Sequence, residues 1–187
     1  MEFVKKNTKI YIISGKSGSG KDTVASMIHE LLLGKKVISL AYASYLKMYA
    51  KEVLGWDGNE PKPREFLQQL GVELIKNKID DKMLINRIIE DIKVYNYFYD
   101  VIIITDARFP SEIEDIKSSF DDVTVIHLSD RENKLTNEEK KHATETSLDG
   151  YNNYDYVISE DNLDNLRVKV KEIVGETYDS RNWWTCW

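Results

Sequence analysis

The sequence has few of the residues that mark specialised chain types: its 187 residues include 1 Cys, 3 Pro and 9 Gly. One thiol, at Cys186, cannot build an internal disulfide framework, which favours a reducing compartment. Low Pro and Gly content beside 42% hydrophobic residues excludes collagen-like and low-complexity chains. We therefore expect a globular protein that buries a core of its own.

Long apolar runs and excess positive charge are also absent. No stretch approaches the roughly 18 apolar residues of a membrane-spanning helix, and residues 1–8 lack the apolar core of a signal peptide. The 26 Lys and Arg residues stand against 32 Asp and Glu residues, for a net charge of -6. We expect a cytoplasmic protein with no membrane and no polymeric nucleic acid as partner, so that any bound anion is small and meets a local basic pocket.

Short apolar runs alternate with amphipathic segments along the chain. The pattern predicts strands at residues 10–13, 37–40, 101–104, 123–126 and 156–158, and helices at 22–33, 44–54, 64–78, 81–95, 110–118 and 163–174. Apolar strands that alternate with helices are typical of a parallel sheet covered on both faces. The sequence therefore predicts a doubly wound α/β fold, a three-layer α/β/α sandwich with a mainly parallel sheet, whose ligands bind beyond the carboxyl ends of the strands.

Residues 1–187 contain no internal repeat, and we expect a single domain. The charged stretch 130–150 is the one segment with the composition of a moving lid, and residues 176–187 end in a tail rich in tryptophan. Docking of this tail onto the body or onto another subunit is the expected role, and a homodimer is compatible with it.

A glycine-rich loop between the first strand and the first helix carries the strongest functional signal. It consists of Gly15, Lys16, Ser17, Gly18, Ser19, Gly20, Lys21, Asp22 and Thr23. A glycine, four residues and then Gly-Lys is the spacing of a phosphate-binding loop. Glycines let backbone N–H groups surround an anion, the helix N-terminus favours that anion, and Lys21 reaches the terminal phosphates.

Asp22 stands where this motif usually has a Ser or Thr that meets a magnesium ion. A carboxylate holds Mg²⁺ directly or through water, and it is also favourable in the first turn of a helix. Thr23 still offers a hydroxyl toward a phosphate. We predict that Asp22 is a metal ligand, and the sequence leaves open whether its contact is direct.

Polar residues follow the most apolar predicted strand, 101–104. Asp106 at the carboxyl edge of the sheet is suited to orient Mg²⁺, and Arg108 is suited to clamp a phosphoryl oxygen. Helix capping by Asp106 is the alternative. Arg64 and Gln68, at i and i+4 on one helix face, suit a phosphate and a base edge, with a merely solvated face as the alternative.

Two features narrow the class of nucleotide-binding protein. No Asn-Lys-x-Asp motif follows the strands at 101–104 and 123–126, which disfavours a GTPase. With 3 His in the chain we expect no zinc site at His142. Thr144 and Glu145, in the same stretch, either order a loop or take part in closing over a substrate.

In combination these patches resemble the deoxynucleoside monophosphate kinases encoded by bacteriophages, which are P-loop kinases related to animal-type phosphomevalonate kinase. Residues 19–23, 64–71, 106–108 and 142–145 carry the resemblance, in that order along the chain. The resemblance implies a fold of the nucleoside monophosphate kinase type, with ATP and Mg²⁺ as cofactors. It also implies a deoxynucleoside monophosphate as the small-molecule acceptor.

The resemblance also implies roles for single residues. The loop 15–23 would bind the ATP phosphates, with Asp22 and Asp106 at the metal. Lys21, Asp106, Arg108 and Arg131 would be catalytic, and Arg131 would begin a lid that continues through Glu145. The acceptor would be bound by Lys47, Arg64, Gln68 and Glu145.

Tyr45 and Leu84 depart from the family's pattern on the acceptor side, so base and sugar preference stay open. A kinase for phosphomevalonate or another small phosphorylated metabolite is therefore the first alternative. A regulatory module that binds a nucleotide without catalysis, and recruits a partner through the tryptophan-rich tail, is the second.

Overall fold

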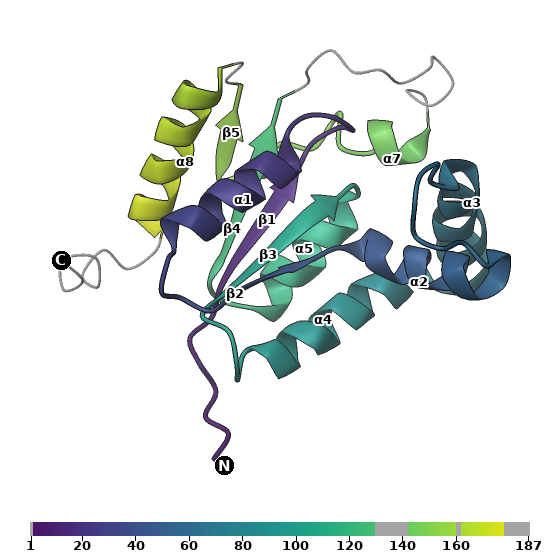
Figure 1. The fold of residues 1–187 in the computed structure, drawn as a ribbon, viewed down its shortest axis with the longest axis horizontal. Coiled ribbons are helices and arrows are strands. Elements are labelled where there is room, and N and C mark those ends of the chain that lie inside the picture. Colours follow the sequence, from purple (N-terminus) through teal and green to yellow (C-terminus); the bar gives the residue numbers. More distant parts are fainter. Residues whose placement is uncertain (1, 130–141, 160–161, 178–187) are drawn as a thin grey trace.

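A computed structural model describes residues 2–129, 142–159 and 162–177. Its centre is a five-stranded sheet in the order β2-β3-β1-β4-β5, and all four strand pairings are parallel (Figure 1). The strands are β1 (Lys9–Ser14), β2 (Val37–Leu40), β3 (Val101–Ala107), β4 (Val123–Leu128) and β5 (Tyr156–Ile158). Each predicted strand is confirmed, and β1, β3 and β4 extend further than their apolar runs.

Helices connect these strands at the predicted places. They are α1 (Lys21–Leu31), α2 (Tyr42–Leu54), α3 (Arg64–Gln68), α4 (Met83–Tyr95), α5 (Pro110–Ser119), α7 (Ala143–Thr146) and α8 (Leu163–Thr177), with the π-helix η1 (Gln69–Ile79) continuing from α3. The predicted helix 64–78 is therefore present but changes its hydrogen-bond pattern after Gln68. The short helix α7 was not predicted.

Each face of the sheet carries its own apolar layer. Side chains alternate along β1, so that Tyr11 and Ile13 face α1 and α8 while Ile10 and Ile12 face α2, α4 and α5. Figure 1 shows α1 and α8 on one side of the sheet and α4 and α5 on the other. The predicted three-layer sandwich is confirmed, and its core consists largely of isoleucine.

The strand order reverses at β1, because β1 lies between β3 and β4. In doubly wound sheets the crevice at such a reversal is where ligands bind. The loop after β1 and the chain that follows β3 meet at this edge. α7 also lies at this end of the sheet, while α3 and η1 project to one side (Figure 1).

Several predictions concern other parts of the chain. Arg131, residues 130–141 of the expected lid, and the tail from 178 on, including Cys186, lie outside the described residues. Within the described ranges, every helix is too short or too polar to cross a membrane.

Candidate active site

The glycine-rich loop adopts a conformation that needs its glycines. Gly15, Gly18 and Gly20 have φ values of 141°, 79° and 96°, which side-chain-bearing residues rarely adopt. A Cβ atom on Gly15 would lie 2.8 Å from the carbonyl oxygen of Leu128 on β4. The loop therefore passes against the end of β4. Its glycines give the backbone the curvature with which successive N–H groups can surround an anion.

Lys21, the first residue of α1, is buried beneath this loop. Its Nζ donates hydrogen bonds to the carbonyl oxygens of Gly15 at 2.9 Å and Lys16 at 2.7 Å. Burial, and next the positive charge of Arg108, lower the pKa of Lys21 to about 8. The ammonium group thus lies among charged neighbours with little solvent, where a phosphate would be a favourable counter-ion.

Arg108 and Glu145 form an ion pair beside the loop. Arg108 Nη1 donates to Glu145 Oε1 at 2.8 Å, and the backbone N–H of Ser17 donates to Glu145 Oε2 at 2.9 Å. Arg108 Nη1 also lies 3.4 Å from the carbonyl oxygen of Thr144. Glu145 is 8% exposed. The fold therefore brings together three of the predicted patches: the loop, the end of β3 and α7.

Asp106 has a structural task at the same edge. Its Oδ1 accepts a hydrogen bond from the backbone N–H of Tyr42, and its Oδ2 accepts one from Ala43, both at 2.8 Å. Both donors lie in the first turn of α2, so Asp106 caps that helix. Burial raises the pKa of Asp106 while these two N–H groups lower it. Its metal-binding role stays a prediction.

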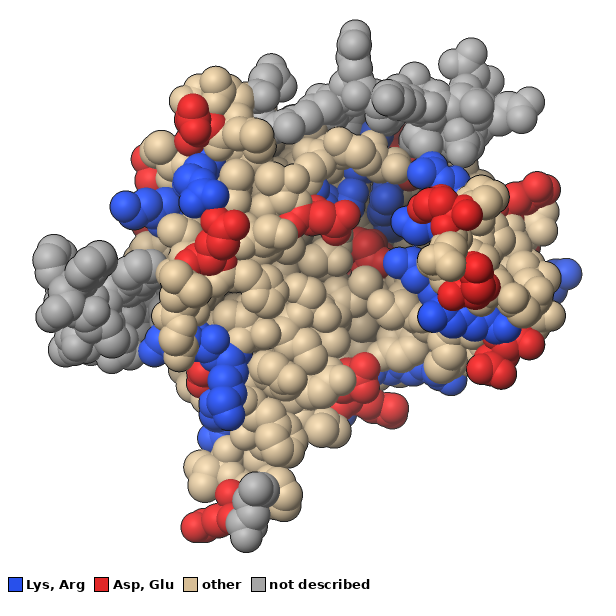
Figure 2. All heavy atoms as spheres, viewed as in Figure 1, with Lys and Arg blue, Asp and Glu red and all other residues tan. Residues whose placement is uncertain are grey.

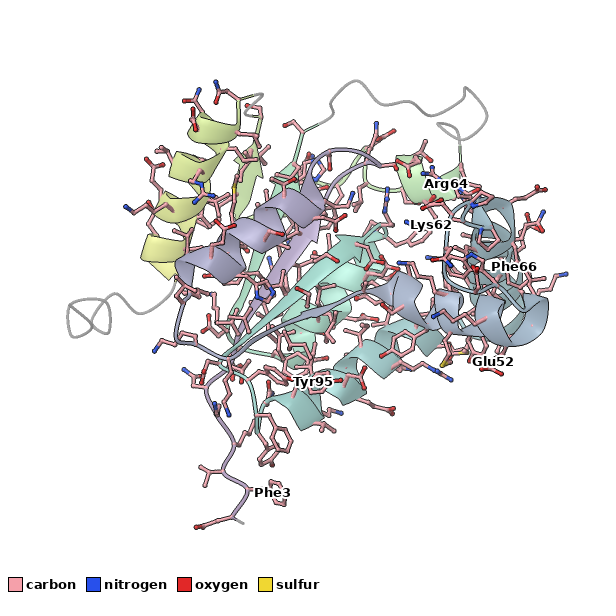
Figure 3. All side chains as sticks on the ribbon, in the orientation of Figure 1. Phe3, Glu52, Lys62, Arg64, Phe66 and Tyr95 are labelled. Carbon is pink, nitrogen blue, oxygen red and sulfur yellow. The ribbon has the colours of Figure 1, made fainter. Side chains whose placement is uncertain are left out.

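A cavity of about 310 Å³ opens between this edge and the arm formed by α3 and η1. Basic residues on its wall are Lys62, Arg64, Lys76 and Arg108, and the apolar ones include Leu46, Leu67, Val72, Ile75, Leu84, Ile85 and Phe109. Figure 2 shows basic and acidic side chains gathered around a hollow beside the arm. In Figure 3, Arg64 lies at the start of the arm and Lys62 lies just before it.

The predicted acceptor residues differ in their relation to this cavity. Arg64, Gln68 and Glu145 line it. Lys47 on α2 is half-buried and does not line the cavity, whereas its neighbour Leu46 does. All four roles stay predictions.

Sequence reasoning missed Lys76 on η1. Its Nζ lies 3.5 Å from the centroid of the Phe109 ring, a cation–π contact in the wall of the cavity. A signal was present, because Arg64, Gln68, Val72 and Lys76 recur every four residues and all four line the cavity.

Sequence reasoning also missed Glu112 on α5, a buried carboxyl group in the cavity wall. Its Oε2 accepts hydrogen bonds from the backbone N–H groups of Arg108 at 2.6 Å and Phe109 at 3.0 Å. Burial raises the pKa of Glu112 to about 7, and nearby Asp106 adds to the rise. Pro110 at the helix start with Glu at its third position was the available signal, since this pattern is typical of a capping box.

A second cavity, of about 370 Å³, lies on the other side of the Arg108–Glu145 pair. Its wall includes Gly15, Lys16, His127, Ser129, Leu148, Asp149, Tyr151, Asn152, Tyr154 and Val157. The two cavities share Arg108, Thr144 and Glu145. This ion pair and the start of α7 therefore separate the two spaces.

The loop offers groups that suit the phosphates of a nucleotide, whereas the described residues contain no group of three or more His, Cys, Asp or Glu side chains that could hold a metal ion. Ser17 N–H donates to a carboxylate oxygen of Glu145, as the N–H groups of an anion-binding loop would donate to a phosphate. Ser19 Oγ is buried without a hydrogen-bond partner within the described ranges. Asp22 and Thr23 are exposed in the first turn of α1, as ligands of a metal that keeps part of its water would be.

Solved kinase structures share this architecture. A mutant of the APS kinase of Mycobacterium tuberculosis is 13% identical with a TM-score of 0.54, and the match covers 90% of this chain and 98% of that one. Shikimate kinase from Acinetobacter baumannii, in complex with shikimate, is 13% identical with a TM-score of 0.50, and the match covers 95% and 97%. At these identities the likeness concerns the fold alone, and it confirms the predicted P-loop kinase fold.

A family model gives the more specific result, while no curated protein sequence matches the chain. The model of the deoxynucleotide monophosphate kinase family matches residues 42–170, which is more than half of the sequence. The matched range includes the residues that line the two cavities, apart from those of the loop. It also includes the ends of β3 and β4. The chain, a phosphotransferase with a P-loop, therefore belongs to the deoxynucleotide monophosphate kinase family.

Proposed function

We propose that the protein transfers the γ-phosphoryl group of ATP, with Mg²⁺, to a deoxynucleoside 5′-monophosphate, yielding ADP and the deoxynucleoside diphosphate. One observation carries the proposal: the cavity beside the arm begins at Ser17 of the phosphate-binding loop and contains Arg108. A small phosphorylated acceptor in this cavity would thus have its phosphate next to the donor's terminal phosphate.

On the donor side, the backbone N–H groups of residues 15–20 and the ammonium of Lys21 would hold the phosphates of ATP. Asp22 would hold Mg²⁺, directly or through water, and Asp106, whose two carboxylate oxygens accept hydrogen bonds from α2, would be the second residue at the metal. A bound Mg²⁺ would neutralise charge on the phosphate oxygens. Arg131 lies outside the described residues, and its place as a catalytic lid residue remains part of the proposal.

In the reaction an oxygen of the acceptor's phosphate forms a bond to the γ-phosphorus of ATP. The bond from that phosphorus to the β,γ-bridging oxygen breaks, and the bridging oxygen leaves on ADP. The acceptor phosphate is already ionised near pH 7, so no strong general base is needed. Catalysis then depends on alignment and on neutralising charge, which is the task we assign to Lys21 and Arg108.

On the acceptor side, the cavity wall combines cationic groups with apolar side chains. Arg64 and Lys62 suit a phosphate, whereas Leu67, Val72 and Leu84 provide apolar surface that suits a base. Gln68 adds an amide that can read the polar edge of a base. Membership of the deoxynucleotide monophosphate kinase family supports the nucleotide acceptor over phosphomevalonate.

The test is ADP release from ATP and Mg²⁺, measured with each common deoxynucleoside monophosphate, its ribose counterpart and phosphomevalonate. The variant Lys21→Ala serves as the blank, and Glu30→Gln, on the surface of α1, serves as a matched control with full activity. We expect acceptor-dependent release with one or a few deoxynucleotides. Release only with phosphomevalonate, or ATP binding without any acceptor-dependent release, would refute the proposed reaction.

A further inference from the structure

The carboxylate of Glu145 accepts hydrogen bonds from two donor groups that we expect to bind a phosphate. Ser17 N–H belongs to the loop's anion cradle, and Arg108 is the arginine at the sheet edge. Both donate to Glu145, at 2.9 Å and 2.8 Å, through different carboxylate oxygens. Glu145 is buried, and these two contacts hold it against the loop.

We propose that Glu145 is an internal substitute for a phosphate group, which the donor nucleotide must displace before the reaction. The inference rests on the proposed function only in naming ATP as the displacing ligand. It differs from the sequence-based expectation, in which Glu145 binds the acceptor.

The geometry explains why such a substitute stabilises the empty protein. The buried ammonium of Lys21 lies at the carbonyl groups of Gly15 and Lys16, and Arg108 shares Glu145 with the next residue of the loop, so two positive charges share a site with little solvent. The carboxylate of Glu145 offsets this repulsion, and it also satisfies the Ser17 N–H group. A triphosphate supplies more negative charge to the same groups, and can therefore replace one carboxylate.

Displacement of Glu145 would connect the two substrate sides. Thr144 and Glu145, together with Arg108, form the wall shared by the two cavities. When Glu145 leaves, the guanidinium of Arg108 loses its ion-pair partner, and its several N–H donors can contact the donor's terminal phosphate and the acceptor's phosphate together. Binding of the donor should therefore strengthen binding of the acceptor, and by linkage the reverse also holds.

A purely structural role makes the opposite prediction. If Glu145 were a brace that keeps Arg108 and the loop in place while ATP is bound, its removal would weaken ATP binding. Both roles predict a lower melting temperature for the empty variant, since both remove buried hydrogen bonds. ATP affinity therefore separates them.

The experiment measures ATP affinity by calorimetry, and melting temperature without nucleotide, for the full chain and for Glu145→Gln and Glu145→Ala. We expect both variants to melt at a lower temperature and to bind ATP about tenfold more tightly. The glutamine variant keeps the size of the side chain, so it reports on the charge even if the alanine variant folds poorly. Unchanged or weaker ATP binding in folded Glu145→Gln would overturn the proposal.

Asp149→Asn provides the matched control. Asp149 follows α7, and its carboxylate pairs with the side chain of Lys16 at 3.1 Å, without a described contact to the loop's backbone N–H groups. The substitution removes the same charge from the same region and also releases the side chain of Lys16, so its gain in ATP affinity is an upper limit for the through-space effect. We expect at most about a twofold gain, and a gain equal to that of Glu145→Gln would also overturn the proposal.

The same titrations with pyrophosphate in place of ATP separate this inference from the proposed function. Pyrophosphate carries the phosphates without a base, and it should also bind more tightly to Glu145→Gln. If that result is obtained and no nucleotide acts as acceptor, the proposed reaction fails while the role of Glu145 stands. If ATP and pyrophosphate bind equally well to the full chain and to both Glu145 variants, the inference fails alone.

Discussion

The central sheet and the arm of α3 and η1 are held in different ways. All six residues of β1 are buried, and the strand is hydrogen-bonded to β3 on one side and β4 on the other. Along the arm, from Arg64 to Ile79, Ile75 is the single buried residue. The arm also touches α2, where Gly71 lies against Leu46.

This contrast divides the proposed task between two parts of the molecule. The phosphate-binding loop directly follows β1, and Arg108 directly follows β3. Both strands are firmly packed, which fixes the geometry of these groups as phosphoryl transfer requires. The far wall of the acceptor cavity belongs to the arm, whose contacts are few. Substitutions in the arm should therefore change the choice and affinity of the acceptor at little cost in stability.

The largest expected effect is on stability, in the sheet. Ile103→Ala removes a fully buried side chain from β3 and should lower the free energy of unfolding by about 2–5 kcal/mol. Leu74→Ala, at a position of η1 that is 44% exposed, should change it by no more than about 0.5 kcal/mol. Urea unfolding of both variants measures this difference, and equal losses would contradict the contrast between sheet and arm.

The next effect is on catalysis. Arg108→Ala, at the sheet edge, should lower kcat by about 10²–10³-fold, because it removes a preorganised positive charge beside the reacting phosphate. Arg64→Ala, on the arm, should mainly raise KM for the acceptor. Steady-state kinetics with the acceptor found by the substrate panel separates the two variants. An unchanged kcat in Arg108→Ala would remove this residue from the catalytic step.

A third effect concerns pH, at the boundary between the sheet and the cavity. The pKa of Glu112 is raised from 4.5 to about 7 in the folded protein, so folding takes up a proton between these values. Stability contributed by this group is therefore lost as the pH rises from 4.5 to 7, by up to about 3 kcal/mol. Glu112→Gln keeps an acceptor for the backbone N–H groups of Arg108 and Phe109 but cannot titrate.

Urea unfolding at several pH values checks this prediction. Glu112→Gln should gain stability relative to the unmodified chain between pH 4.5 and pH 8, and the gain should level off above pH 7. Asp106, whose pKa is also raised, adds a slope to both proteins, and this slope differs between them only by the interaction of its charge with that of Glu112. A difference that does not change with pH would show that Glu112 titrates normally.

The smallest expected effect is in the arm. A Cβ atom at Gly71 would lie 3.0 Å from Cδ1 of Leu46, so Gly71→Ala pushes a cavity-lining side chain aside. We expect KM for the acceptor to rise by about tenfold or less, with KM for ATP unchanged. Gly175→Ala on α8, where a Cβ would meet no atom within 4 Å, is the matched control. A rise in KM for ATP equal to that for the acceptor would contradict the separation of the two sides.

Much of this organisation could be predicted because it depends on local patterns. The apolar β-branched run at Ile102–Ile104 and the Gly-rich loop that ends at Lys21 each indicate their structure within a few residues. Their meeting at one edge followed from the rule that carboxyl ends of parallel strands lie together. The capping role of Asp106 was foreseen only as an alternative, because the helix that it caps, α2, lies far from it in the sequence.

The remaining features depend on contacts between distant segments. Neither Glu145 nor Ser17 has a local signal for the hydrogen bond between them, since α7 reaches the loop only through the tertiary fold. The change from α- to π-helix after Gln68 likewise has no clear sequence pattern. The raised pKa of Glu112 reflects its burial in the tertiary fold, which periodicity along α5 does not reveal.

The position of β1 in the middle of the sheet has a consequence for biosynthesis. This strand is made first, yet its two neighbours begin only at Val101 and Val123. During translation its isoleucines therefore stay without their strand partners until the segments that begin at Val101 and Val123 have left the ribosome. Non-local parallel pairing of this kind folds slowly and exposes apolar surface to aggregation. The yield of soluble protein should accordingly depend on temperature and chaperones during expression more than on the stability of the finished fold.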